Sequence, residues 1–299
     1  MQASRPRVAV VGHVEWVQFA RVPHVPCAGE VVHAHDPFEE PAGGGGVAAV
    51  QLARLAGAAT FLTALGRDEL GERSVARLKE LGVDVHATQR AATRRASTLV
   101  DDAGERTIIT LGPRLEPLGE DDELPWGALG AMDAVYFTAG DLDALRAARE
   151  ARVLVASPRA GEALGQGVQL DALVLSGDDA VERRQASRAQ EEAQLVGFTE
   201  GARGGAYRKR SGASGRWDPA HPSARPLAQP PALPAATLPG EVGDSYGCGD
   251  SFAAGLTYGL GAGLEVPAAL ALAARCGAVC MTGRGPYGRQ LMERDLLGN

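Results

Sequence analysis

Residues 244–250 have the sequence DSYGCGD, and residues 251–256 continue it as SFAAGL. Gly247 and Gly249 allow a tight turn, and the small apolar residues after Asp250 predict a buried helix. The first N–H groups of a helix lack partners within it and lie at the positive end of its dipole, so this turn is suited to an anion. A carboxylate at the same point, Asp250, can accept a proton from a hydroxyl. The segment fits phosphoryl transfer to an alcohol, although a helix capped by Asp after an ordinary glycine turn would have the same sequence.

The composition is ordinary for a folded protein. The chain has 299 residues, of which 45% are hydrophobic and 22% charged, and this length fits one large α/β domain or two small ones. The net charge of −7 argues against a nucleic-acid-binding protein, which usually carries a basic stripe. We therefore expect no nucleic-acid partner.

Neither export nor a membrane span is expected. The N-terminal segment lacks the long apolar stretch and cleavage site of a signal peptide. The most apolar helical region, residues 264–280, is interrupted by Glu265, Pro267 and Arg275. The cysteines, at positions 27, 248, 276 and 280, lack metal-site spacing, so buried free thiols and a cytoplasmic location are expected.

Short apolar segments alternate with helical segments along most of the chain. The predicted strands are residues 8–11, 61–66, 134–138, 153–156, 172–175 and 194–199, and helices are predicted at residues 47–55 and 69–81. This alternation is typical of βαβ units and predicts a parallel sheet covered on both faces. Residues 97–100 and 106–110 flank an Asp-Asp-Ala-Gly turn and predict a hairpin, whereas residues 211–239 predict irregular strands and loops.

Taken in order, these segments resemble the ribokinase, or PfkB, family of carbohydrate kinases over nearly the whole chain. Residues 244–250 are similar to the family signature Asp-Thr-x-Gly-Ala-Gly-Asp, and residues 199–204, TEGARG, to its nucleotide loop Thr-x-Gly-x-x-Gly. Residues 66–83 resemble its Gly-Asp-Asp…Gly…Leu-x-x-x-Gly-Val motif, and Gly43–Gly46 stands where relatives carry a Gly-Gly substrate loop. The resemblance implies one α/β domain over residues 1–299: a three-layer α/β/α fold with a mostly parallel sheet. It also implies a small β lid formed by residues 14–38 and 93–110.

The resemblance further implies an ATP-dependent kinase that phosphorylates a hydroxymethyl group of a sugar or related polyol. Asp250 would be the base, and the amides of Gly247, Cys248 and Gly249 the anion hole. The residues implied to bind the nucleotide are Thr199, Gly201, Gly204 and Gly277. Mg²⁺ would be associated indirectly with Asp179, and a monovalent cation, K⁺, would lie near Asp244.

The residues expected to bind the acceptor depart from the family pattern. Relatives often carry Asn-x-Asp where this chain has Glu15 and Val17, and Val47 replaces the Asn of the substrate loop. The loop would still contribute Gly43, Gly44 and Gly45. Arg106, in the lid, could contact a phosphate or carboxylate of the substrate or be solvated, and Asp141 is a candidate hydroxyl acceptor at a strand end.

Several alternatives remain open from the sequence. One is a nucleoside kinase of the adenosine type, since the sugar clamp is altered. Another is a catalytically weakened ligand-binding or regulatory protein, which the presence of Asp250 disfavours. A dinucleotide oxidoreductase is disfavoured because Gly12-His13-Val14 is no Gly-x-Gly-x-x-Gly fingerprint. By default, we expect a homodimer formed through the lid and no membrane partner.

Overall fold

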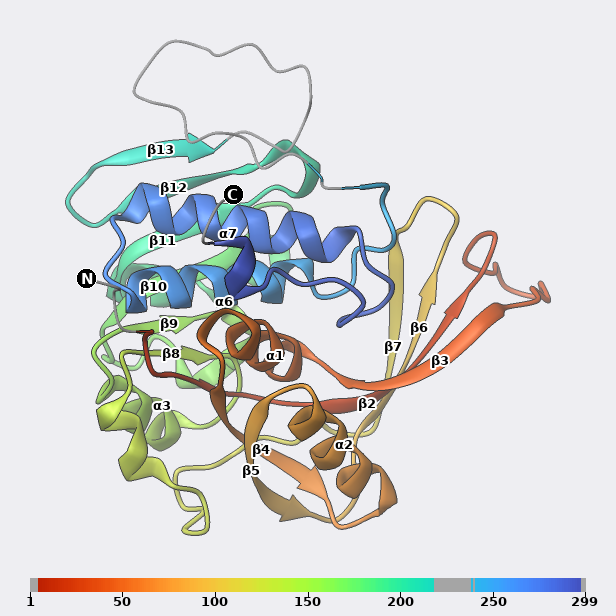
Figure 1. Ribbon diagram of the computed structural model, residues 1–299, viewed down its shortest axis with the longest axis horizontal. Coiled ribbons are helices and arrows are strands. Elements are labelled where there is room, and N and C mark those ends of the chain that lie inside the picture. The colour runs from red at the N-terminus through yellow and green to blue at the C-terminus, as the bar shows by residue number, and fades with distance from the viewer. Residues whose placement is uncertain (1–4, 218–237, 239, 297–299) are drawn as a thin grey trace.

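The structure, a computed structural model, describes residues 5–217, 238 and 240–296 (Figure 1). Its largest element is a nine-stranded sheet with the order β13-β12-β11-β10-β9-β8-β1-β4-β5. The strands are β1 (Val8–Val11), β4 (Ala59–Gly66), β5 (Val83–Arg90), β8 (Ala134–Phe137), β9 (Leu154–Ala156), β10 (Leu170–Ser176), β11 (Ala193–Thr199), β12 (Gly205–Lys209) and β13 (Ser214–Trp217). All neighbours from β5 to β11 are parallel, and β12 and β13 add an antiparallel edge. The predicted mostly parallel sheet is therefore confirmed.

Helices cover both faces of this sheet because its central strands are apolar on both sides. In β1, Val8 and Val10 belong to one buried cluster, which includes residues of α1, α6 and α7, whereas Ala9 and Val11 belong to another, which includes residues of α3. The helices are α1 (Gly44–Ala56), α2 (Glu69–Glu80), α3 (Leu142–Arg149), α4 (Ala180–Gln185), α5 (Ala189–Glu192), α6 (Cys248–Gly261) and α7 (Val266–Met281). Short 3₁₀ helices are η1 (Trp126–Ala131), η2 (Pro158–Ala163), η3 (Gly201–Arg203) and η4 (Glu293–Asp295). Period-two alternation thus produces the three layers.

A second, four-stranded sheet has the order β3-β2-β6-β7 and extends to one side of the main sheet (Figure 1). It consists of β2 (Glu15–Arg21), β3 (His35–Ala42), β6 (Arg95–Val100) and β7 (Arg106–Leu111), and we call it the small sheet. The predicted hairpin is confirmed as β6 and β7, which pair antiparallel. These strands come from or border the segments assigned to a lid; closure over a substrate remains a prediction.

Tyr246 connects the small sheet to the start of α6. Its ring packs edge-on against Phe19 of β2 at a centroid distance of 4.9 Å, and Phe19 stacks on Phe38 of β3 at 4.7 Å. The Tyr246 hydroxyl also accepts a hydrogen bond from the N–H of Gly43, just before α1, at 3.2 Å. One buried side chain therefore joins the signature segment, the glycine loop and the small sheet.

Several sequence expectations need correction. The first helix begins at Gly44 rather than residue 47, so the glycine loop forms its first turn. All four cysteines are free, but only Cys276 and Cys280 are buried, whereas Cys248 is half-buried and Cys27 is exposed. Of residues 211–239, the structure describes β13, while residues 218–237 and 239 lie outside the described part. None of the helices in the described residues is long and apolar enough to cross a membrane.

Candidate active site

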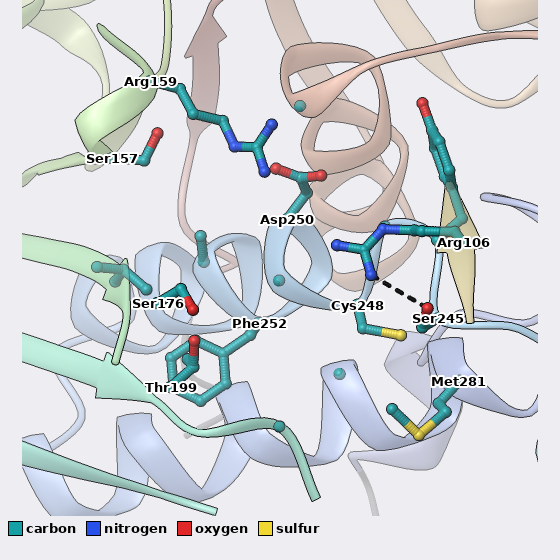
Figure 2. A pocket seen from close by; sticks show the side chains of 18 of the residues that line it. Arg106, Ser157, Arg159, Ser176, Thr199, Ser245, Cys248, Asp250, Phe252 and Met281 are labelled. Atoms are coloured by element: carbon teal, nitrogen blue, oxygen red, sulfur yellow. Dashed lines mark hydrogen bonds between the residues drawn. The ribbon is translucent and has the colours of Figure 1, made fainter. Parts of the chain in front are cut away.

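A cleft of about 1010 Å³ lies at the carboxyl ends of the parallel strands, between the start of α6 and the small sheet (Figure 2). Segments that follow β1, β9, β10 and β11 line one side, and β7 contributes from the small sheet. Open α/β sheets bind ligands at this edge because loops from several strands converge there. All the signature residues from Ser245 to Asp250 line this cleft.

The N-terminus of α6 presents backbone donors to the cleft. Gly247 precedes the helix with φ of 78°, in the left-handed region, and a Cβ there would lie 2.9 Å from Cγ1 of Val47. The first helical bond is from Ser251 N–H to the Gly247 carbonyl, at 2.8 Å. Among the described residues, no side chain caps the helix, and the N–H groups of residues 247–250 have no hydrogen-bond acceptor. These donors can therefore bind an anion.

The Asp250 carboxylate lies beside these amides. Burial raises its pKa, and the nearby Arg159 and Arg106 guanidinium groups oppose that rise. Figure 2 shows the two guanidinium groups on opposite sides of Asp250. A Cβ on Gly44 would lie 2.9 Å from Asp250 Oδ1, so the missing side chain leaves space beside the carboxylate. Asp250 thus has room for a hydroxyl group within reach.

A second charged group lies at the start of β2. Glu15 Oε2 lies 3.2 Å from Arg94 Nε, and the two side chains are only 7% and 15% exposed. Burial raises the pKa of Glu15 despite the opposing effect of Arg94. His13 is buried beside them, and burial together with nearby arginines lowers its pKa well below the usual value, so the ring is neutral at pH 7.

The predicted nucleotide residues also line the cleft. Thr199, Gly201, Gly204 and Gly277 all line it. Phe252 and Trp217 also line it and stack with a centroid distance of 5.4 Å, adding apolar surface. The cleft therefore combines glycine backbone with aromatic groups in this part of its lining.

The remaining candidates have different positions. Glu15, Gly43, Gly44 and Arg106 line the cleft, whereas Gly45 does not and donates its N–H to the His13 carbonyl at 3.1 Å.

Asp141 also lies outside the cleft lining. It caps α3 by accepting hydrogen bonds from the N–H groups of Ala144 and Gly119, both at 2.9 Å. Its position at a strand end therefore serves the local helix start.

The two acidic residues expected near cations also lie outside the lining. Asp179 is exposed and caps α4, while its neighbour Asp178 and Glu182 line the cleft. Asp244 is buried and accepts hydrogen bonds from the N–H groups of Tyr246 and Gly285. Among the described residues it has no ion-pair partner within 4.0 Å, and burial raises its pKa. A buried carboxylate without such a partner fits an adjacent cation.

Sequence reasoning missed His13, Arg94, Arg114 and Arg159, all of which line the cleft. His13 and Arg159 each follow the end of a parallel strand, and that rule of strand ends could have identified them. Arg94 and Arg114 flank the hairpin of the small sheet, and only the pairing of β6 with β7 brings them to the same end.

Comparison with known proteins agrees with this architecture. The structure is similar to a ribokinase from Thermotoga maritima, with a TM-score of 0.72, 18% sequence identity and 98% coverage of both chains. It is also similar to an Arabidopsis thaliana ribokinase solved with ribose and ATP (TM-score 0.69, 17% identity, 98% of this chain and 97% of that chain). An adenosine kinase from Sinorhizobium meliloti matches with a TM-score of 0.70, 16% identity and 98% coverage of both chains. At these identities the likeness shows the fold alone.

The family comparison goes further. None of the curated proteins compared with the chain matches it. The family model described as pfkB family carbohydrate kinase, however, matches residues 5–200 and 229–291, which is most of the chain. With the ribokinase-like fold established independently, the chain belongs to the pfkB family of carbohydrate kinases.

Proposed function

We propose that this chain is an ATP-dependent kinase that phosphorylates a hydroxymethyl group of a sugar or related polyol. The start of α6 carries this proposal, because Asp250 and the open amides of residues 247–250 share one cleft. Phosphoryl transfer requires positioning and stabilisation of charge rather than covalent chemistry by the protein. Family membership supports the type of reaction, and the geometry supports the residues.

In this mechanism, Asp250 accepts the proton of the acceptor hydroxyl as its oxygen attacks the γ-phosphorus of ATP. The bond between the γ-phosphorus and the bridging oxygen breaks, and ADP leaves. The amides of Gly247, Cys248 and Gly249 donate hydrogen bonds to the transferred group, which carries the developing charge. Cys248 contributes through its backbone, so its side chain is not required for the step.

The nucleotide is assigned to the end of the cleft formed by Thr199, Gly201, Gly204 and Gly277. The described residues contain no cluster of three or more ligating side chains, which fits a Mg²⁺ ion held mainly by phosphate oxygens. Asp178 and Glu182 line the cleft and would be able to assist, whereas Asp179 lies outside the lining. Mg²⁺ bound there would neutralise phosphate charge, and K⁺ beside Asp244 would support the loop before α6.

The similarity to an adenosine kinase keeps a nucleoside acceptor as the second candidate. The altered position at Glu15 is compatible with either class, because a carboxylate can accept hydrogen bonds from the hydroxyl groups of a ribose or of a free sugar. A regulatory protein without turnover is the third.

The test is ADP release measured on purified protein with ATP and Mg²⁺ against a panel of sugars, polyols and nucleosides. The proposal predicts turnover with a sugar or polyol that is lost in Asp250→Asn. Turnover only with nucleosides would support the second candidate, and ATP binding without turnover on any acceptor would support the third. The dependence on K⁺ is measured by exchanging it for Na⁺.

A further inference from the structure

Tyr136 is a buried polar side chain in the cleft to which the proposed mechanism gives no role. It lies near the carboxyl end of β8, in register with Val10 of β1 and Val155 of β9, so its neighbours in the parallel sheet are apolar. The residue is only 1% exposed, yet it lines the cleft. A buried tyrosine hydroxyl usually has a hydrogen-bond partner. The groups around this hydroxyl therefore indicate what it can bind.

Two further hydroxyl groups lie beside that of Tyr136. Thr138 follows β8 and Ser157 follows β9, and their hydroxyl oxygens are 3.0 Å apart. Burial and the negative charge of Asp250 raise the pKa of Tyr136, and hydrogen bonds to Ser157 and Thr138 oppose the rise. Tyr136 is therefore a neutral phenol at pH 7. We call Tyr136, Thr138 and Ser157 the hydroxyl cluster.

The hydroxyl cluster lies beside the proposed base. Gly44 of the glycine loop packs against both, since a Cβ there would lie 3.4 Å from Thr138 Oγ1 and 2.9 Å from Asp250 Oδ1. Figure 2 shows Ser157 next to Arg159, whose side chain extends toward Asp250. An acceptor with one hydroxyl group at Asp250 therefore lies close to the cluster.

The hydroxyl cluster can still accept hydrogen bonds. Each hydroxyl group has one hydrogen to donate and two lone pairs that accept, so every member keeps a lone pair when all the hydrogens are used within the cluster. Among the described residues, no group outside the cluster donates a hydrogen bond to it. Tyr136 and Ser157 line the cleft, so a ligand can approach them.

The chemistry of the cleft favours a neutral hydroxyl group as the ligand of this cluster. An ionised phosphate or carboxylate has no hydrogen to donate to a lone pair. A cationic donor such as an ammonium group would be repelled by Arg159 and Arg106, whose positive charges act on the nearby Asp250. A hydroxyl group donates a hydrogen bond and carries no charge, so it meets both conditions.

We infer that the hydroxyl cluster is a second recognition site for the acceptor, in which Tyr136 and Ser157 bind a hydroxyl group other than the one that reacts at Asp250. This inference rests on the proposed function and narrows its substrate class to acceptors with at least one further hydroxyl group. The contact is with a part of the acceptor that the reaction does not change. Tyr136 is therefore a specificity-determining residue, separate from Glu15 of β2.

The first test combines Tyr136→Phe, which removes only the hydroxyl group, with monodeoxy analogues of the best acceptor in the ADP-release assay. For the full acceptor, we expect kcat/KM to fall about tenfold to 100-fold in the variant. The wild-type protein should lose a similar factor with the analogue that lacks the recognised hydroxyl group, and the variant should lose nothing further with it. The control is Tyr207→Phe, since Tyr207 of β12 does not line the cleft. No loss in Tyr136→Phe, or the same loss with the acceptor and with every analogue, would overturn the inference.

The second test uses Ser157→Ala. The KM for the acceptor is expected to rise about threefold to tenfold, with the KM for ATP unchanged. In Ser157→Ala/Tyr136→Phe, the loss should be smaller than the product of the two single losses, because both residues bind the same group. Ser187→Ala is the control, since Ser187 is exposed between α4 and α5 and does not line the cleft. A change in the KM for ATP alone would contradict the inference.

A binding measurement separates this inference from the proposed function. Asp250→Asn and Asp250→Asn/Tyr136→Phe are titrated by calorimetry in the presence of ATP, with ribose, glucose and adenosine as probes, each beside its monodeoxy analogues. A probe that binds more tightly than one of its analogues in the first protein, but not in the second, would support the inference. That result would stand even if the wild-type protein transfers no phosphate, in which case only the proposed function fails. Equal binding of each probe and all its analogues, or binding of none, would overturn the inference.

Discussion

The two ends of the cleft around Asp250 are built in different ways. At the start of α6, the donors are consecutive backbone amides and the proposed base lies among them, so four successive residues, 247–250, supply the whole group. At the proposed acceptor end, Glu15, Arg94 and Arg114 come from three separate segments and line the cleft with their side chains. The first region is fixed by a turn and a helix, whereas the second exists only when two sheets come together. The proposed catalytic group is therefore local in the sequence, whereas the proposed acceptor site is not.

The largest expected effect is that of Asp250→Asn. Loss of the base should lower kcat by about 100-fold to 10,000-fold, while ATP still binds because the nucleotide end is unchanged. Steady-state kinetics and ATP titration measure the two effects. Asp143→Asn, an exposed change on α3, is the control. Near-normal turnover in Asp250→Asn would contradict the assignment of Asp250 as the base.

Gly247→Ala tests whether the backbone itself is the catalytic element. Its positive φ and the clash with Val47 should displace the amides and lower kcat by roughly 100-fold. Gly263→Ala is a matched control, since Gly263 has a similar φ of 77° and nothing within 4 Å of the added Cβ. Equal kcat values for the two variants would show that the turn is only structural.

Glu15→Ala tests the side-chain end through stability. It leaves Arg94, which is 15% exposed, without its partner, and the free energy of unfolding should fall by about 3–5 kcal/mol. In Glu15→Ala/Arg94→Met both charges are absent, so a smaller loss is expected. Denaturant unfolding of both variants measures the difference, and a double variant less stable than the single one would contradict this prediction.

The smallest expected effect is a shift of the pH profile by Arg159→Gln. Asp250 must be ionised to accept a proton, so activity is lost as the pH falls through its pKa. Burial raises that pKa and Arg159 opposes the rise, so removing the positive charge should move the acid limb of kcat/KM about one pH unit higher. The same profile for Arg146→Gln should not move. An unchanged acid limb in Arg159→Gln would mean that Arg159 does not act on the base.

This contrast also explains how far the sequence alone could lead. The parallel sheet, the β6–β7 hairpin and the turn before α6 follow from local alternation and from adjacent glycines, so they were predictable. The position of Asp141 was predictable, but its use as the cap of α3 was not, because both uses need a polar residue at the same strand end. Arg94 and Arg114 carry no local signal, since an arginine beside a hairpin is usually solvated. Their convergence depends on the pairing between strands and on the way the small sheet meets the main sheet.

Tyr246 restricts how the small sheet can move relative to the start of α6. It holds Phe19, the N–H of Gly43 and the start of α6 in one contact group, so β2 and β3 cannot swing away without pulling on the anion-binding turn. β7 is exposed along its whole length, and the contacts that join its start to the signature segment are hydrogen bonds with Ser245 rather than buried packing. We therefore expect the two parts of the small sheet to move by different amounts. β2 and β3, which are coupled to the start of α6, should move less than β7, which carries Arg106. Amide hydrogen exchange would show this as slow exchange in β2 together with faster exchange in β7.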